Sequence, residues 1–162
     1  MTIKQGRYTA NYPDDFIVVL IGFRINKVAK VREWLPVMRA AKSMTKNALQ
    51  LPGKPLLNSE TVWSLDDPRV FFMVQHWRSF EDLITWANDK SLDHKPAMKA
   101  FFKRTGYNGN VGIWHEVYKV SAGQFEAIYA NMPRMSMAAA GEYVSLRESS
   151  KATERMGDPK AR

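Results

Sequence analysis

The sequence predicts an α+β fold in which helices cover one face of an antiparallel sheet, and two observations support this prediction. The apolar segments follow the order strand, helix, strand, strand, helix, strand, which is the βαββαβ order of a ferredoxin-like sandwich. The segment Phe16–Arg24 is apolar at odd and even positions alike, which is typical of a strand with both faces buried. A chain of 162 residues suits one domain with a single core.

The remaining elements follow from periodicity and turn signals. An apolar stripe at helical spacing predicts a helix over Val28–Leu49, in which Pro36 either opens a second helix or kinks one long helix. Two β-rich runs joined by the turn residues Asp66–Pro68 predict an antiparallel hairpin, and Ser79 is a suitable N-cap for the helix that follows. The other expected elements are hairpin strands over 56–65 and 69–77, a short helix over 92–103, and strands over 111–120 and 123–132.

These elements divide the chain into three parts and suggest how it assembles. Residues 1–13 form an N-terminal arm and residues 14–143 form the domain. Residues 144–162 form a C-terminal tail that has little to bury, and we expect it to be mobile or dependent on a partner. Because the predicted sheet is apolar on both faces, the face without helices should not stay open to water. We therefore expect a homodimer in which two copies pack sheet to sheet.

Composition restricts the function classes. The chain has no cysteine, which excludes disulfides, thiolate nucleophiles and cysteine-based metal sites. Its 24 basic and 16 acidic residues give a net charge of +8, which suits nucleic acid, an anionic membrane surface or an anionic ligand such as a haem propionate. No nucleic-acid-binding motif accompanies these residues, so a solvated basic face is the favoured interpretation. The longest apolar run is too short to span a bilayer and the N-terminus has no apolar signal region, so we expect a cytoplasmic protein.

Four segments carry a resemblance to a known family: VVLIGFRINKVAKVREWLPVMRA, MVQHWRSFEDLITWANDKSLDHKPAMKAFFKRTG, NVGIWHEVYKVSAGQFEAIYANMP and AAAGEYV. Together they resemble the bacterial and fungal monooxygenase-like family of dimeric α/β-barrel proteins, over residues 14–146 and most distinctively at GIWHE and IYANMP. The resemblance implies a ferredoxin-like dimeric α/β barrel. It also implies a relation to antibiotic-biosynthesis monooxygenases, haem-degrading monooxygenases, chlorite dismutases and aldoxime dehydratases.

His94 is the first candidate for a metal ligand. On a helix it shares one face with Met98, Phe101 and Phe102. The segment WRSFEDLITWANDKSLDHK resembles the haem-degrading monooxygenases, which implies that His94 is the axial ligand of a haem b iron and that Trp77 lies at the same site. Met98 and Phe102 would then line the porphyrin, although both also fit a simple core position. The alternative for His94 is a ring that caps the helix or packs in the core with one nitrogen bonded to a carbonyl.

His115 and Glu116 are the candidate catalytic residues. On an extended strand His115 points to one face, and Trp114, Glu116 and Tyr118 point to the other. His115 is a candidate distal acid or base, or a second candidate for the iron ligand, and Glu116 and Tyr118 are candidate hydrogen-bonding groups within a cavity. The alternative for His115 is a buried structural histidine.

Three further residues complete the candidate site. Trp114 would stack on a flat ligand such as haem or fill the core. Arg24 would contact an anionic group at the pocket mouth, or would be an ordinary charge at a strand end. We expect His76 at the surface or rim, and the three histidines do not have the spacing of a zinc site.

These observations favour a haem-binding, monooxygenase-like oxidoreductase that acts on a small hydrophobic organic substrate. The alternatives are a haem-dependent lyase similar to aldoxime dehydratase, a cofactor-free oxygenase, and a non-catalytic dimer that binds haem or another small ligand. A basic protein associated with nucleic acid is a weaker alternative.

Overall fold

The larger part of the molecule is a four-stranded antiparallel sheet covered by three helices, as the sequence predicts. The structure is a computed structural model that describes residues 2–92, 94–146, 151, 152 and 156. The strand order is β3-β4-β2-β5. The elements in chain order are β2 (Phe16–Ile25), α1 (Val31–Leu49), β3 (Leu56–Trp63), β4 (Val70–Trp77), α2 (Phe80–Asn88), α3 (His94–Thr105) and β5 (Val111–Val120).

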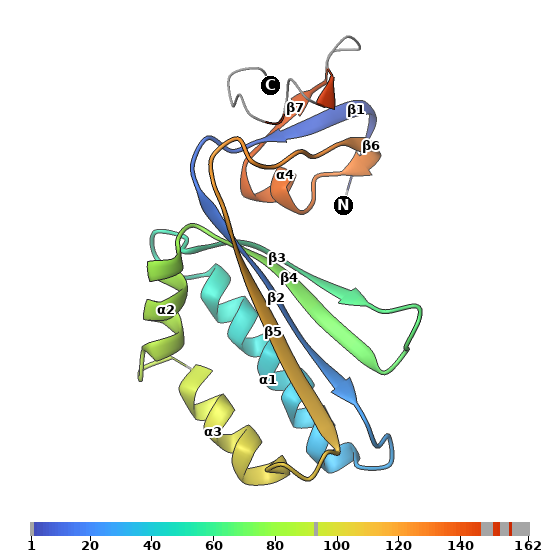
Figure 1. Ribbon diagram of the computed structural model, residues 1–162, viewed down its shortest axis with the longest axis vertical. Coiled ribbons are helices and arrows are strands. Elements are labelled where there is room, and N and C mark those ends of the chain that lie inside the picture. Colours follow the sequence, from blue (N-terminus) through green and yellow to red (C-terminus); the bar gives the residue numbers. More distant parts are fainter. Residues whose placement is uncertain (1, 93, 147–150, 153–155, 157–162) are drawn as a thin grey trace.

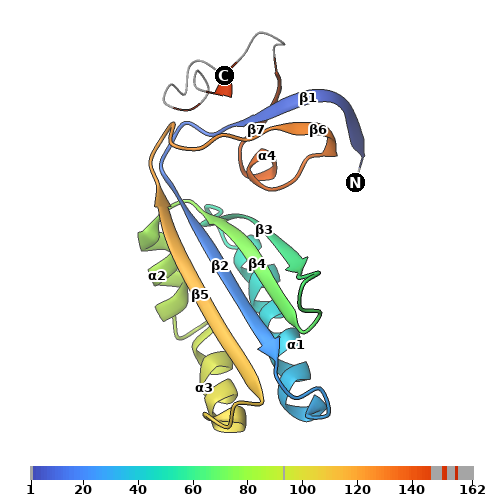
Figure 2. The same cartoon turned by 45° about the vertical axis from the view of Figure 1, so that its right-hand side comes forward.

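Helices α1, α2 and α3 all lie on the same side of this sheet, which we call the helix face; the opposite side is the open face (Figures 1 and 2). Side chains alternate along β2, so its odd-numbered residues point to the helix face. There Ile17 and Val19 pack with Ala48 of α1 and Leu83 of α2. The even-numbered residues, Leu20 among them, point to the open face. The apolar character of β2 at every position therefore reflects two different environments.

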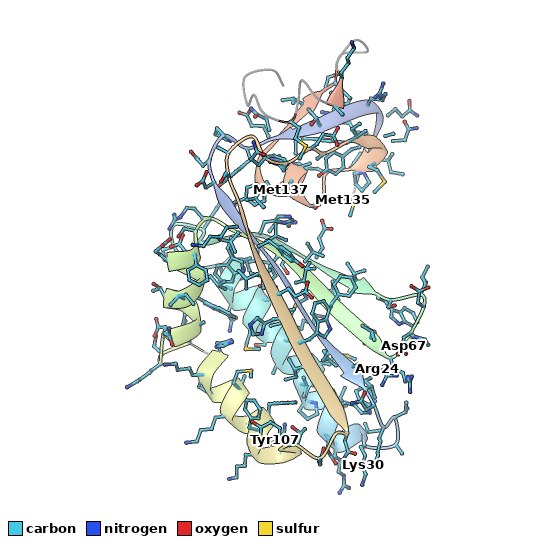
Figure 3. The ribbon with its side chains drawn as sticks, in the orientation of Figure 1. Arg24, Lys30, Asp67, Tyr107, Met135 and Met137 are labelled. Atoms are coloured by element: carbon cyan, nitrogen blue, oxygen red, sulfur yellow. The ribbon has the colours of Figure 1, made fainter. Side chains whose placement is uncertain are left out.

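A second sheet of three strands stands over one end of the open face (Figure 1). Its central strand β1 (Ile3–Asn11) pairs with β6 (Tyr129–Pro133) on one side and β7 (Glu142–Ser145) on the other, and the short helix α4 (Met137–Ala140) precedes β7. Met137 is buried in a cluster with Phe16 of β2, and Met135 packs against the same cluster at the junction of the two sheets (Figure 3). The N-terminal arm thus contains a strand.

The structure also corrects and sharpens the expected boundaries. The strand expected over 123–132 is wrong in its bounds, because β6 spans only 129–133 and belongs to the second sheet. Pro36 lies inside one continuous helix, and the Ser79 hydroxyl caps α2 by accepting the Asp82 N–H at 3.0 Å. Of the expected C-terminal tail, Val144 and Ser145 belong to β7. Residues 147–150, 153–155 and 157–162 lie outside the described residues.

Within the described residues, no helix is long and apolar enough to cross a membrane.

Candidate functional site

A cavity of about 420 Å³ lies between the helix face, α1 and α3. Apolar side chains from the sheet and from both helices form its walls. They include Phe71 and Met73 from β4, Met38 and Met44 from α1, and Met98 and Phe101 from α3. This volume and this lining are typical of small-molecule sites, which usually hold an apolar ligand and a few polar groups. The four methionines add flexible, polarisable side chains that adapt to the shape of a ligand.

The space exists because α1 and α3 present small side chains where they face each other. Ala40 and Ala41 of α1 and Ala97 of α3 all line the cavity. Two lining residues are exposed, Lys42 of α1 and Thr61 of β3, whereas the others are buried or half-buried. We call the position of Lys42 and Thr61 the cavity mouth. Among the residues that the structure describes, Lys42 is the only charged residue that lines this cavity.

His94 lies at the first residue of α3, beside the cavity but outside its lining. Its ring packs against Trp86 with centroids 4.8 Å apart, and its Nδ1 lies 3.1 Å from the Ala87 carbonyl oxygen. With Nδ1–H donating to this carbonyl, Nε2 keeps its lone pair, which is the tautomer that metal-bound histidines usually adopt. Helical spacing puts His94 on the same face as Met98, which does line the cavity. The carbonyl contact expected of a structural histidine is therefore present, and so is Met98, the neighbour expected beside a haem ligand.

The other residues expected around a haem lie apart from the cavity lining. Phe102 is 45% exposed and its ring packs against Tyr107, whereas its neighbour Phe101 is buried in the cavity wall, because one residue along a helix turns the side chain by 100°. Trp77 is fully buried in the core next to Trp86, and its Nε1–H donates to Gln75 Oε1 at 3.0 Å. A ligand in this cavity would contact Met98 and Phe101 but neither Phe102 nor Trp77.

Trp114 lies on the open face, on the opposite side of the sheet from the helices. It points to the same side as Phe72, with ring centroids 6.0 Å apart, and its indole edge lies over Gly22. A Cβ at Gly22 would come within 2.9 Å of Trp114 Nε1 and within 2.7 Å of the Phe71 carbonyl oxygen. The absence of a side chain at Gly22 therefore allows the indole to lie flat on the sheet. Trp114 is placed for contact across the open face and does not line the cavity.

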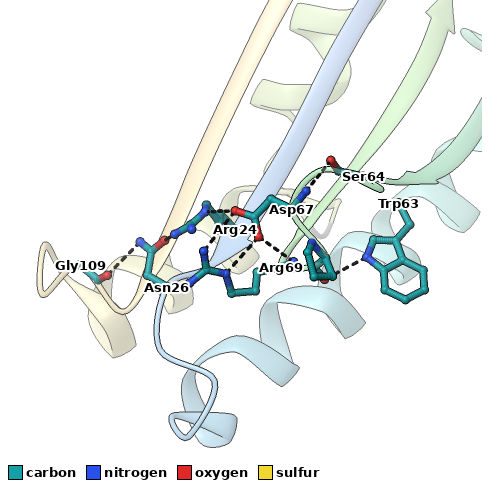
Figure 4. A network of polar contacts seen from close by, with 8 residues as sticks. Arg24, Asn26, Trp63, Ser64, Asp67, Arg69 and Gly109 are labelled. Carbon is teal, nitrogen blue, oxygen red and sulfur yellow. Dashed lines mark hydrogen bonds and ion pairs between the residues drawn. The ribbon is translucent and has the colours of Figure 1, made fainter.

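Arg24 is held in a polar network at the end of the sheet (Figure 4). Its Nε–H donates to Asp67 Oδ2 at 2.7 Å, and its Nη1 donates to Asn26, whose own amide donates to the Gly109 carbonyl. Hydrogen bonds from Arg69 and Arg24 hold the pKa of the Asp67 carboxyl well below its usual range. This network ties the β3–β4 hairpin to the loop before β5. Arg24 is thus engaged in structure and does not lie at the cavity mouth.

His115 and Glu116 lie on opposite faces of β5, as the alternation predicts, but neither lines the cavity. In the single chain His115 is exposed, and the described part of the chain gives its ring no hydrogen-bond partner. On the open face the Tyr118 hydroxyl donates to Glu116 Oε2, which raises the pKa of Tyr118. The structure therefore places Glu116 on the open face and His115 on the helix side of the sheet.

His76 is buried, which overturns the expectation of a surface or rim position. The second sheet covers this end of the open face, and only 4% of His76 is exposed beside Phe16, at a centroid distance of 6.1 Å. Its Nδ1 has no hydrogen-bond partner among the described residues. Burial lowers the pKa of His76, and the nearby Glu60 carboxylate opposes this shift. No group of three or more metal-ligating side chains is found in the described ranges.

Comparison with known proteins identifies the family. Residues 16–137 match the family model described as monooxygenase af470-like. The chain belongs to this family. A search of curated proteins finds no match.

Two solved aldoxime dehydratases share the fold of this family member. The aldoxime dehydratase OxdRE in complex with butyraldoxime is 15% identical with a TM-score of 0.66, over 99% of this chain and 44% of that chain. A second aldoxime dehydratase is 23% identical with a TM-score of 0.60, over 86% and 40%. The chain therefore spans less than half the length of these two proteins. SnoaB from Streptomyces nogalater, a cofactor-independent oxygenase, is 9% identical with a TM-score of 0.46, over 64% and 91%.

Sequence reasoning missed most of the cavity wall. Nothing in the sequence distinguishes Ala40, Ala41 and Ala97 from ordinary helix-forming residues, or Lys42 from the other surface lysines. The only available signal is that small residues recur at helical spacing on both helices of a predicted sandwich. Met98 is the one predicted cofactor-binding residue that the structure brings to the cavity.

Proposed function

We propose that this protein is a monooxygenase-type oxidoreductase whose substrate, a small hydrophobic organic molecule, binds in the cavity between α1, α3 and the sheet. The observation that carries the proposal is the cavity itself, about 420 Å³ with apolar walls, in a member of a monooxygenase-like family. The walls would exclude water and orient the substrate through Phe71, Phe101 and the methionines. In such a site the protein supplies geometry and a dry environment.

The cavity interior offers little acid–base chemistry of its own. Among the described lining residues there is no histidine, aspartate or glutamate, and the Lys42 and Thr61 side chains lie at the mouth. Electrons for oxygen chemistry would come from the substrate itself, as in a cofactor-free oxygenase, or from a bound group. A proton would enter or leave through the mouth or from the His94 side of α3.

The geometry of His94 favours a haem-dependent form of this function as the second candidate. Its donor chemistry fits a haem iron, because the Ala87 carbonyl holds Nδ1 and leaves Nε2 free to coordinate. Met98, on the same helix face, would lie next to the porphyrin. Haem would supply the redox chemistry of oxygen or peroxide, or a site for a substrate nitrogen as in a lyase similar to aldoxime dehydratase. The apolar walls would then orient the substrate beside the iron.

Two alanines on α3 provide the test of the cavity as the reaction site. Ala97 lines the cavity, whereas Ala100, three residues further along the helix, is exposed. Oxygen consumption would be measured with a panel of hydrophobic phenols and quinols, and conversion of aldoximes to nitriles would be measured separately, each with and without added haemin. We expect Ala97→Leu to lose most of the activity, since its side chain would occupy part of the space in which the substrate binds, and Ala100→Leu to keep it. Equal activity in both variants would place the reaction elsewhere.

Haemin titration followed by absorption decides between the two forms. Haem bound through an imidazole would give an intense band at the blue end of the visible spectrum, which His94→Ala should remove and His115→Ala should retain. Loss of the band in His115→Ala alone would move the ligand to β5. A protein that consumes oxygen with a substrate but gives no haem band in any variant is a cofactor-free oxygenase.

We also propose that the active form is a homodimer joined through the open face. Phe72 and Trp114 lie on this face with Leu20, and Tyr118 beside them is 49% exposed in a single chain. A second copy would cover this apolar surface and leave the cavity of each protomer on its own helix side.

A further inference from the structure

The distribution of charge on the two cavity helices points to the class of ligand. Helix α1 carries four basic residues and one acidic residue, and helix α3 carries four basic residues and no acidic one. Their net charges of +3 and +4 make up seven of the eight net positive charges of the chain. These are the same two helices that line the cavity. A negatively charged ligand would therefore be attracted to the side of the molecule on which the cavity lies.

Lys42 is the one cation placed to contact such a ligand at the cavity. The described part of the chain gives it no ion-pair partner. The single acid of α1, Glu33, accepts hydrogen bonds from Asn108 and Asn110, and it lies nine residues or about 13 Å along the helix axis from Lys42. Glu60 precedes Thr61 on β3 but points to the open face, where it accepts the Ser136 N–H. No described carboxylate thus competes for Lys42 at the mouth.

The interior of the cavity excludes a buried polar head. The described buried side-chain atoms without a hydrogen-bond partner belong to Asn11, His76 and Asn110, and none of these residues lines the cavity. The nearby hydroxyl of Thr45 already donates to Met73 Sδ at 3.1 Å. A polar group of the ligand placed deep inside would lose its water without gaining a partner, which is unfavourable. The polar group of a ligand should therefore stay at the mouth.

We propose that the cavity binds an organic anion whose apolar body lies among the methionine and aromatic side chains and whose negative group lies at the mouth beside Lys42. A carboxylate there accepts from the Lys42 ammonium and from the Thr61 hydroxyl. The stem of Lys42 follows the apolar rim while its ammonium stays in water. The identification of this anion as the substrate rests on the proposed function. Its binding in the cavity does not depend on that function.

Isothermal titration calorimetry at low ionic strength tests the proposal with decanoate, decanol and decylammonium, which share one apolar chain. We expect decanoate to bind about fivefold more tightly than decanol, as one partly exposed ion pair provides, and decylammonium to bind most weakly. Lys42→Met should bring decanoate and decanol to the same affinity. Lys46→Met is the matched control, because Lys46 lies one turn further along α1, is exposed and does not line the cavity. Its decanoate preference should be retained.

Three results would overturn the proposal: no binding of decanoate, equal affinity of the wild type for decanoate and decanol, or an equal loss in Lys46→Met and Lys42→Met. The last result would mean that diffuse helix charge, and not a contact at the mouth, selects the ligand. Ala97→Leu should weaken decanoate and decanol alike, which locates both in the cavity. Anion-selective binding without any oxygen consumption would reject the proposed function and keep this inference. If Ala97→Leu removes oxygen consumption but the wild type shows no anion selectivity, the proposed function is kept and this inference is rejected.

Discussion

The two faces of the four-stranded sheet differ in their free volume and in the reactive side chains that they carry. The helix face contains a cavity walled by methionine, alanine and aromatic side chains, with its one charged residue at the mouth. The open face and its ends carry three of the polar residues considered from the sequence, whereas His115 points to the helix side. Arg24 is bound to Asp67, Glu116 to Tyr118, and His76 is buried under the second sheet.

Most of these reactive side chains therefore make contacts within the fold, such as ion pairs and hydrogen bonds, or are buried. A ligand site here is defined by volume and by charge around it, more than by an acid or a base. His94 shares a face of α3 with Met98, which lines the cavity, and its Nδ1 contact with the Ala87 carbonyl leaves the lone pair on Nε2. The contrast between a hollow helix face and a closely packed open face can be tested directly.

The largest effect is expected from adding one methyl group at the centre of the open face. In Gly22→Ala the new Cβ would lie 2.7 Å from both the Phe71 carbonyl oxygen and the Phe72 Cβ, so the backbone of β4 must shift. We expect the free energy of unfolding to fall by about 3 kcal/mol in urea denaturation. Gly112→Ala is the matched control on the same face, since its nearest contact would be 3.6 Å. Similar losses in both variants would contradict close packing at Gly22.

The next effect concerns assembly through the open face. Leu20→Arg places a charge at the centre of the proposed dimer interface, and we expect the dimer dissociation constant to rise about tenfold or more in sedimentation equilibrium. Val31→Arg is the control, because Val31 is exposed on α1, which lies on the opposite side of the sheet. A wild type that sediments as a monomer at all concentrations would reject the interface.

A smaller effect is expected from pH, through His76. Burial lowers the pKa of His76, so the folded protein binds the proton less readily than the unfolded chain does. This histidine therefore leaves stability intact above the unfolded pKa of about 6.5, and stability falls as the pH falls through that value toward the folded pKa. Urea denaturation between about pH 7.5 and about pH 5 should show a flatter dependence for His76→Phe than for the wild type.

Glu60 provides a second check on this prediction. Its carboxylate raises the pKa of His76 against the effect of burial. Glu60→Gln keeps an oxygen that can accept the Ser136 N–H but removes the charge. The loss of stability on acidification should therefore become steeper in this variant. An unchanged dependence in both His76→Phe and Glu60→Gln would mean that His76 does not control it.

The sequence predicts best those features that arise from local periodicity. The strand over 111–120 has the bounds expected from its alternating side chains, and Ser79 caps its helix through the predicted contact. The two-sided burial of β2 follows from apolar residues at odd and even positions. Each of these signals lies within one segment and needs no knowledge of its partners.

Features that depend on distant pairing could not be predicted in this way. Strand β1 is polar along much of its length, and its register shifts between Lys4 and Arg7, where Gly6 has a φ of +102°. Its partners, β6 and β7, are more than 110 residues away in the chain. Because the sequence predicts only an arm over residues 1–13, it does not reveal the cover over His76. The cavity was missed for a related reason: it results from small side chains on two helices that only the fold brings together.

The smallest effect is expected from filling the cavity, and it completes the contrast with Gly22. Ala97→Leu adds three carbon atoms, but into the existing space of about 420 Å³. We expect the free energy of unfolding to change by less than about 1 kcal/mol, because the new side chain gains contacts without displacing its neighbours. The same urea denaturation measures it. A loss as large as that of Gly22→Ala would mean that both faces of the sheet are packed alike, and the helix face would then have no room for a substrate.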